Sequence, residues 1–152
     1  MNENLSYKEK MAACAEFVNK VAEALGESYE LVGSCNRDAS LYLIPKGTID
    51  QLSYYGKPDK SLRFSDHWNW LSNLKKCKDP NMVQCRSLDM PWCRRREEPG
   101  KATKPRFGVQ VCLYDDSTKC YRHVFGDKFD RKAKTWTWIE SDPSMLAAQM
   151  LG

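Results

Sequence analysis

The feature that most constrains this fold is an amphipathic stretch near the N-terminus that has the period of a helix. Ser6 and Glu9 match the capping box, in which the two side chains bond backbone N–H groups that a helix start leaves without partners. Gly26 supplies a C-terminal stop. We predict a helix from Tyr7 to Leu25 whose apolar residues, spaced by three and four, face a core: Met11, Cys14, Phe17, Val18, Val21, Ala22 and Leu25.

Short strand-like segments follow this helix and are separated by turn residues. Their β-branched and aromatic residues, or their alternation of apolar and polar positions, predict strands. The first two should form a hairpin around the turn 36–39, and the last three an antiparallel meander with a loop over Gly126–Lys132. The predicted strands are 29–35, 40–44, 61–64, 106–113, 120–125 and 135–139.

Two further stretches have helical signals. A second helix is predicted from about Asp66 to Lys78, and Pro80 prevents its extension. A terminal helix is predicted from Pro143 to Met150, with Ser141 or Asp142 as its N-cap and the proline at its first position.

Together these elements predict the fold class. We expect a single α+β domain over residues 1–152, in which the N-terminal amphipathic helix packs on a mostly antiparallel sheet, followed by a second helix mid-chain, a C-terminal β-meander and a short terminal helix. No apolar run approaches the ~20 residues of a membrane span, and the first ten residues lack the apolar segment of an export signal. We therefore expect a cytoplasmic protein with no membrane partner.

The net charge of +4 is unevenly distributed along the chain. Residues 1–55 carry 5 basic and 8 acidic side chains, residues 56–107 carry 13 and 6, and residues 108–152 carry 6 of each. The middle third therefore holds a net charge of +7, an excess that favours association with an anionic partner.

A long segment without periodicity carries much of this charge. Residues 88–106 include three prolines and a glycine, and loops of this length in a small domain are usually functional or disordered. Cations interleaved with tryptophans are the combination that nucleic-acid surfaces use, because the cations neutralise phosphates and the rings stack on bases. The alternative is a solvated loop in which Arg94, Arg95 and Arg96 pair with Glu97 and Glu98. The residues predicted to contact a partner are Lys75, Lys76, Lys78, Arg86, Trp92, Arg94, Arg95, Arg96, Lys101, Lys104 and Arg106.

The seven cysteines are an odd number, which in a cytoplasmic chain predicts free thiols rather than disulfides. Cys77, Cys85 and Cys93 are separated by seven residues each, and His67 precedes them. Such a set could hold a tetrahedral Zn²⁺ ion, so zinc is the one cofactor that the sequence suggests. The alternative is four unrelated side chains, since the spacing is not that of a zinc ribbon.

No catalytic signature occurs in the sequence. Neither His67 nor His123 lies in a recognised nucleophile or metalloprotease motif, and no phosphate-binding glycine motif is present. We therefore expect no enzyme activity and predict no catalytic residues. The alternative is a small metal-dependent nuclease that uses Asp127, Asp130 or His123.

The overall build, a motif-poor α+β chain of this size with a polar, aromatic-rich surface, resembles the accessory proteins of phages and other mobile elements. Among these it is similar in kind to anti-CRISPR and other anti-defence inhibitors. The resemblance implies stoichiometric binding to a nuclease complex in the host cytoplasm and transfers no residue roles.

The expected function is that of a non-catalytic binding protein whose basic central loop docks on an anionic surface, as an inhibitor of a nucleic-acid-targeting defence complex would. The expected partner is the acidic protein surface of such a complex, or DNA or RNA directly. A second hypothesis is a DNA- or RNA-binding regulator stabilised by zinc.

Overall fold

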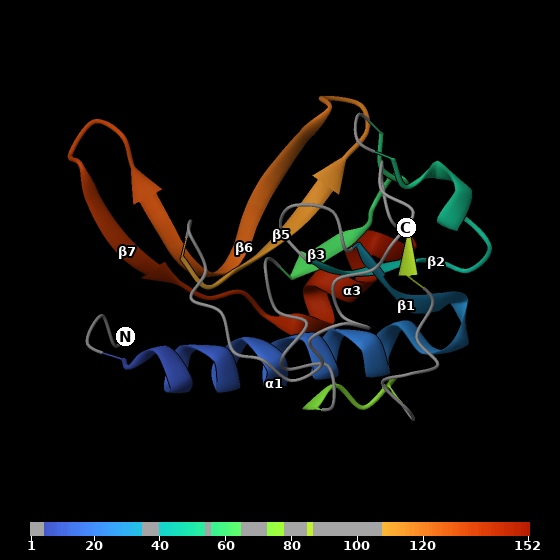
Figure 1. Cartoon of the computed structure of the whole chain (residues 1–152), viewed down its shortest axis with the longest axis horizontal. Helices are drawn as coiled ribbons and strands as arrows, with labels where there is room; N and C mark the ends of the chain where they lie inside the picture. The colour runs from blue at the N-terminus through green and yellow to red at the C-terminus, as the bar shows by residue number, and fades with distance from the viewer. Residues whose placement is uncertain (1–4, 35–39, 54–55, 65–72, 78–84, 87–107) are drawn as a thin grey trace.

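The computed structural model of the protein describes residues 5–34, 40–53, 56–64, 73–77, 85–86 and 108–152 (Figure 1). These residues form an α+β arrangement in which a long N-terminal helix and a short C-terminal helix lie on one face of a curved sheet. The predicted fold class is confirmed.

The N-terminal helix α1 (Tyr7–Leu25) begins and ends where the sequence predicts. The Ser6 hydroxyl accepts a hydrogen bond from the Glu9 amide at 3.1 Å, and the Glu9 carboxylate accepts one from the Ser6 amide at 3.0 Å. All seven predicted core residues of the helix are buried, and Ala15 joins them. The capping box therefore fixes where the helix begins, and the spacing of its apolar residues sets the face that meets the sheet.

The sheet has seven strands in the order β4-β1-β2-β3-β5-β6-β7. All neighbours are antiparallel except β1 and β4, which are parallel. The connections include two short 3-10 helices, η1 (Gly26–Ser28) and η2 (Ile49–Gln51). The strands are β1 (Tyr29–Ser34), β2 (Leu41–Pro45), β3 (Leu62–Phe64), β4 (Cys85–Arg86), β5 (Gln110–Asp115), β6 (Cys120–Asp130) and β7 (Thr135–Ile139).

The C-terminal helix α3 (Pro143–Leu151) packs beside α1 and completes the core. Asp142 is its N-cap and accepts hydrogen bonds from the Ser144 and Met145 amides at 2.8 and 3.2 Å. The helix buries Leu146, Ala147 and Met150 in the same apolar cluster as α1 and the facing strands. A smaller cluster of Val32, Tyr42, Ile44 and Leu52 lies apart from this main core.

Strand β6 is longer than the sequence predicts, and the expected loop over Gly126–Lys132 is wrong. β6 continues to Asp130, so that only residues 131–134 form the turn before β7. The strand changes partners at Gly126, which pairs with Gln110 of β5 on one side and Ile139 of β7 on the other. A register shift at Val111/Cys112 and a φ of +104° at Gly126 bend the strand there. In the sequence, a glycine at such a bend cannot be told from a glycine that begins a loop.

The predicted second helix, Asp66 to Lys78, lies largely outside the described residues. Its described end, 73–77, forms a turn rather than an α-helix. This turn is held to α1 because the Asn19 side chain donates to the Asn73 carbonyl at 3.0 Å and accepts from the Lys75 amide at 2.8 Å. Leu74 of this turn is buried.

Four cysteines have described side chains, and all four are free thiols, as predicted: Cys14, Cys77, Cys112 and Cys120. Burial raises the pKa of Cys112 to about 11, so this thiol stays protonated at neutral pH. Neither helix of the described part of the chain combines the length and the apolar composition that a bilayer crossing requires.

Replacement of Gly126 by alanine should destabilise the fold, because a Cβ there meets the Val109 carbonyl oxygen and lies 3.0 Å from the Gln110 Cα. We expect Gly126→Ala to lower the free energy of unfolding by about 3 kcal/mol in urea denaturation. Gly47→Ala is the matched control, since its φ of +83° is also positive but nothing lies within 4 Å. The control should lose only about 1 kcal/mol; equal losses would show that the close approach at Gly126 is unimportant.

Candidate functional site

The second half of β6 and the whole of β7 form a two-stranded arm that projects from the body of the protein (Figure 1). We call residues Gly126–Ile139 the β6–β7 arm. The register pairs Asp127 with Trp138 and Phe129 with Trp136. Because side chains alternate along a strand, these four lie on one face of the arm, with Lys128 and Asp130 on the other.

The base of the arm is fixed to α1 by a buried carboxylate. Asp127 is 6% exposed and forms an ion pair of 2.9 Å with Lys10, while its second oxygen accepts a hydrogen bond of 2.9 Å from the Val109 amide. Lys10 also lies 6.0 Å from the ring centre of Trp138. The helix thereby holds the arm at its first pair of residues.

Aromatic rings continue this anchorage into the core. Phe17 of α1 stacks on Phe125 with ring centroids 4.4 Å apart, and Phe125 meets Trp138 edge to face at 5.7 Å. Trp138 is only 8% exposed, and its indole N–H donates to Glu140 at 2.9 Å. The arm is therefore attached through a packed base rather than through a single strand connection.

Further along the same face, the next pair of rings is open to water. Phe129 is 42% exposed and Trp136 is 48% exposed, and their centroids lie 5.2 Å apart with the rings inclined by 55°. Cross-strand aromatic pairs stabilise hairpins, so the contact alone indicates no ligand. Its exposure nevertheless leaves flat apolar surface at the projecting part of the molecule.

The turn at the end of the arm is closed by Asp130, whose carboxylate accepts hydrogen bonds from the Lys132 and Ala133 amides at 2.9 and 3.2 Å. Lys134 ends the turn with a φ of +55°. This left-handed conformation costs a residue with a Cβ about 1–2 kcal/mol, and glycine would adopt it without that cost. A charged residue occupies this position in spite of the strain.

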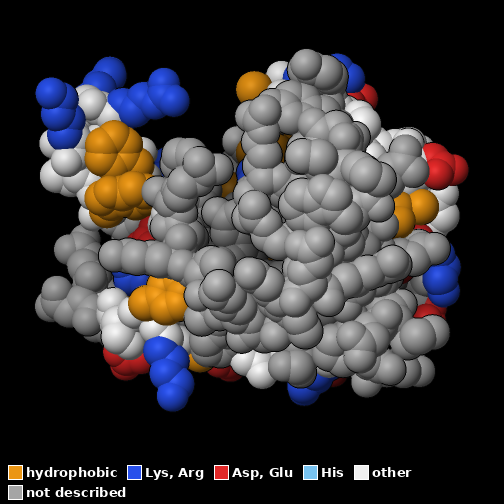
Figure 2. Space-filling view, in the orientation of Figure 1, with side chains coloured by type: hydrophobic (Ala, Val, Ile, Leu, Met, Phe, Trp, Pro, Cys, Tyr) orange, Lys and Arg blue, Asp and Glu red, His pale blue; other side chains and the backbone are white. Residues whose placement is uncertain are grey.

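The arm carries four exposed cations: Arg131, Lys132 and Lys134 lie in the turn next to the open rings, and Lys128 lies on the opposite face of the ribbon. None of them forms an ion pair with another residue that the structure describes. Asp130 is the one carboxylate within residues 128–134, and it accepts hydrogen bonds from the amides of the turn. Figure 2 shows Lys and Arg side chains grouped beside hydrophobic ones at the end of the arm, at the upper left.

The nearby histidine does not add to this charge. Burial, and then the positive charge of Lys128, lower the pKa of His123, so that its ring is neutral at neutral pH. The positive character of the arm therefore comes from lysine and arginine.

Most of the residues that the sequence predicts for partner binding lie outside the described part of the chain. The backbone of Arg86 belongs to β4, and Lys75 and Lys76 lie in the turn beside α1. Lys76 donates to the Gly26 carbonyl at 2.7 Å, where a cation complements the C-terminal end of the helix. The predicted contact residues outside the described ranges are Lys78, Trp92, Arg94, Arg95, Arg96, Lys101, Lys104 and Arg106.

The predicted zinc set is also largely outside the described ranges, which hold neither His67 nor Cys93 and give only the backbone of Cys85. Cys77 is a buried free thiol. Within the ranges the structure describes, no group of three or more His, Cys, Asp or Glu side chains could hold a metal ion. The zinc site stays a prediction.

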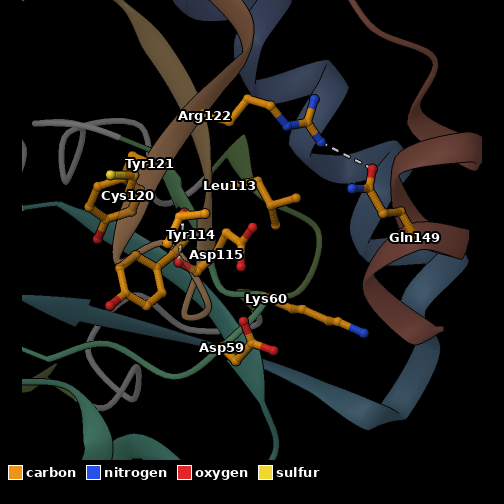
Figure 3. A pocket seen from close by; sticks show the side chains of 10 residues that line it. Asp59, Lys60, Leu113, Tyr114, Asp115, Cys120, Tyr121, Arg122 and Gln149 are labelled. Carbon is orange, nitrogen blue, oxygen red and sulfur yellow. Dashed lines mark hydrogen bonds between the residues drawn. The ribbon is translucent and has the colours of Figure 1, made fainter.

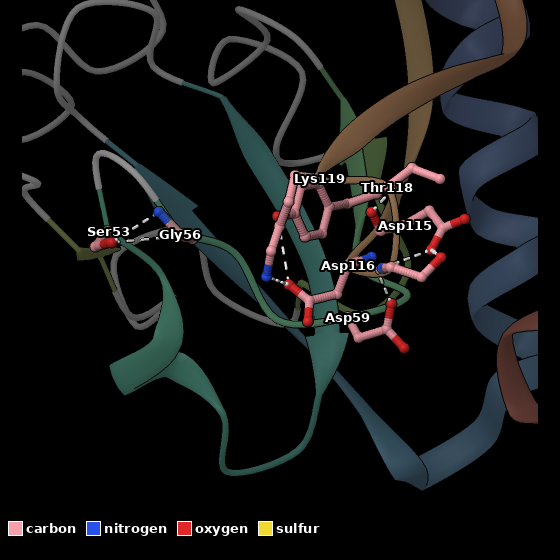
Figure 4. Close-up of polar contacts among 9 residues, drawn as sticks. Ser53, Gly56, Asp59, Asp115, Asp116, Thr118 and Lys119 are labelled. Atoms are coloured by element: carbon pink, nitrogen blue, oxygen red, sulfur yellow. Dashed lines mark hydrogen bonds and ion pairs between the residues drawn. The ribbon is translucent and has the colours of Figure 1, made fainter.

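The carboxylates suggested for a nuclease have structural partners. Asp127 bonds Lys10 and the Val109 amide, and Asp130 bonds the turn amides on the opposite face of the arm. At the β5–β6 turn, Asp115 accepts a hydrogen bond from the Ser117 amide at 2.9 Å. Asp116 pairs with Lys119 at 2.7 Å, and its amide donates to Asp59 at 2.8 Å (Figure 4). The structure does not bring Asp127 and Asp130 together.

A pocket of about 360 Å³ lies between the outer end of β5–β6 and α3 (Figure 3). Its charged residues are two cations, Lys60 and Arg122, and two carboxylates, Asp59 and Asp115. Arg122 donates to Gln149 at 3.1 Å across its rim. Hydrogen bonds from the Ser117 hydroxyl and amide lower the pKa of Asp115, which is therefore ionised at neutral pH. The opposite charges balance, so the lining selects no particular class of ligand.

Comparisons with protein-family models, with curated proteins and with solved structures give no significant match. The candidate site is therefore defined by its geometry and charge alone. Sequence reasoning missed the arm because it interpreted Gly126 as the end of a strand. The signal that could have found it is the alternation of Asp127, Phe129 and Trp136, Trp138 across a short turn.

Loss of the charge on Asp127 should loosen the base of the arm. In Asp127→Asn the amide oxygen can still accept from the Val109 amide, but the attraction to Lys10 is lost at a buried position. We expect the free energy of unfolding to fall by about 1–2 kcal/mol in urea denaturation. Glu16→Gln removes the exposed Glu16–Lys20 pair and should cost less than about 0.5 kcal/mol. Equal effects of the two variants would argue against the anchor.

Proposed function

We propose that the protein is a non-catalytic binding protein that occupies an anionic surface of its partner, with the β6–β7 arm as one contact region. The observation that supports this most strongly is that four exposed cations and two exposed aromatic rings occur together at a projecting part of the fold, with three of the cations in the turn next to the rings. In the described part of the chain the arm is held at its base by Lys10 and projects at its other end, an arrangement that suits a docking element.

Solubility alone does not account for this grouping. Cations scattered over a surface keep a protein soluble, and carboxylates interspersed among them limit the local field. At the arm four cations occur within residues 128–134 together with one carboxylate, a local net charge of +3. Exposed Phe129 and Trp136 lower solubility rather than raise it, so their position next to the cations favours a contact surface.

The central segment provides a second cationic region in the sequence. Its excess of seven positive charges between residues 56 and 107 still predicts a contact with an acidic protein surface or with DNA or RNA. Occupation of such a surface would suit a stoichiometric inhibitor of a nucleic-acid-targeting defence complex, which is the activity that the sequence resemblance implies. This identification remains a proposal, as does cytoplasmic action.

Removal of charge from the arm should weaken binding to a polyanion. We expect the triple variant Lys128→Gln, Arg131→Gln, Lys132→Gln to bind a fluorescently labelled heparin oligosaccharide about tenfold more weakly or worse in an anisotropy titration, because the local field is lost. The control is Lys8→Gln, Lys20→Gln, Lys46→Gln, which removes the same charge from exposed positions elsewhere. The control should change the affinity less than about threefold.

The same titration separates the two cationic regions. Arg94→Gln, Arg95→Gln, Arg96→Gln tests the central segment with an equal change of net charge. If only this variant lost affinity for heparin, the contact would lie in the central segment and not in the arm. Equal small losses for all three variants would show that total charge, and no particular surface, governs binding and would contradict the proposal.

A further inference from the structure

We infer that the anionic partner of the β6–β7 arm is single-stranded nucleic acid, whose bases stack on Phe129 and Trp136 while its phosphates meet the cations of the turn. The inference rests on the proposed function, because it names the partner of the same surface. It uses the two aromatic rings as well as the charge, because a partner that is recognised by charge alone would make no use of the rings.

The rings have the accessibility that base stacking requires. Phe129 and Trp136 keep 42% and 48% of their surface exposed, whereas Trp138 on the same face keeps 8%. Their planes are inclined by 55°, so neither ring covers the other completely. Stacking on exposed aromatic rings tolerates any base, and it requires that the face of the base be free of its neighbours in the stack, as it can be in a single strand.

The cations continue from the rings toward the end of the arm. Arg131 lies two residues beyond Phe129, and Lys134 lies two residues before Trp136, so that both ring positions lead directly into the turn. Lys132 lies between them in the turn. A strand of nucleic acid whose bases cover the rings would therefore carry its phosphates past this group of charges, which would release their counterions.

Lys134 adds a cation to this group. Its left-handed backbone, with a φ of +55°, favours glycine over lysine, yet the position holds a cation that has no ion-pair partner within the described ranges. Lys60 and Lys119 have the same left-handed backbone, so this conformation alone does not indicate a ligand. Lys134 contributes to the proposed surface through its charge beside the rings.

Two other partners are less consistent with these observations. A two-stranded ribbon can enter the major groove of duplex DNA, but there it reads the edges of paired bases and makes no use of ring faces. An acidic protein surface would satisfy the cations, but it would need apolar side chains beside its carboxylates to cover the two rings, whereas a single strand offers charge and flat bases at every nucleotide. Both partners are outcomes of the test below.

The experiment measures anisotropy of three labelled 12-mers: oligo-dT, an abasic strand with the same phosphates, and a DNA duplex. The wild-type protein should bind oligo-dT at least about tenfold more tightly than the abasic strand, because each stacked base contributes to affinity. Phe129→Leu/Trp136→Leu keeps apolar contact in the hairpin and removes the flat rings. It should bind oligo-dT as weakly as the abasic strand, with binding to the abasic strand unchanged.

The matched control is Met145→Ala/Leu151→Ala, which removes two other exposed apolar side chains, 73% and 54% exposed, from α3. It should bind oligo-dT as the wild type does.

Lys134→Gly should melt at the same or a higher temperature than the wild type while it binds oligo-dT several-fold more weakly. Its slope of log K against log salt should be smaller in magnitude by about 0.7. Thermal melting of each variant separates loss of binding from loss of folding.

The outcomes distinguish the inference from the proposed function. Equal affinity for oligo-dT and the abasic strand, with heparin binding still dependent on the arm cations, would overturn the inference and leave the proposed function standing. Tighter binding to the duplex than to oligo-dT would also overturn it. If the arm variants change no affinity at all, for heparin or for any 12-mer, both the inference and the proposed function are wrong.

Discussion

The buried carboxylate of Asp127 is the constraint on which the arrangement of core and arm depends. It lies at the point where β6 passes from pairing with β5 to pairing with β7, and it joins the sheet to α1 through Lys10 at 2.9 Å. A carboxylate at 6% exposure is stable only when it is paired and hydrogen-bonded, and here Lys10 and the Val109 amide supply both contacts. The strand is buried from Val124 to this residue; beyond it, side chains on the same face meet water.

This change of environment along one strand gives the arm its chemical character. Phe125, Asp127 and Phe129 follow one another at short intervals in β6, yet the first two are buried and the third is exposed. The bend at Gly126 directs the last residues of β6 away from the body. The fold thus leaves the rings of Phe129 and Trp136 exposed instead of burying them, and it places them beside cations on a two-stranded ribbon. A binding role explains this combination more directly than stability does.

Most of the architecture could be predicted from the sequence, because it depends on local signals. The capping box and Gly26 fixed the ends of α1, Asp142 and Pro143 predicted the start of α3, and alternation predicted the strands of the antiparallel sheet. The arm could not be predicted in the same way, since a glycine inside a long bent strand has the same sequence signal as a glycine in a loop. The parallel pairing of β4 with β1 depends on contacts between residues distant in sequence, which no local pattern encodes. The cations of residues 56–107 were identified by counting charges along the sequence, and such a count does not say where the side chains lie in space.

The most direct test of this account is a titration of ¹⁵N-labelled protein with oligo-dT, followed through the indole N–H signals of the five tryptophans. Trp136 and Trp138 lie two residues apart on the same face of the arm, but only Trp136 is exposed, and the Trp138 N–H is bonded to Glu140. The account predicts that the signal of Trp136 shifts progressively with added strand while that of Trp138 stays nearly constant. Perturbation of other tryptophans with the Trp136 signal unmoved would contradict it.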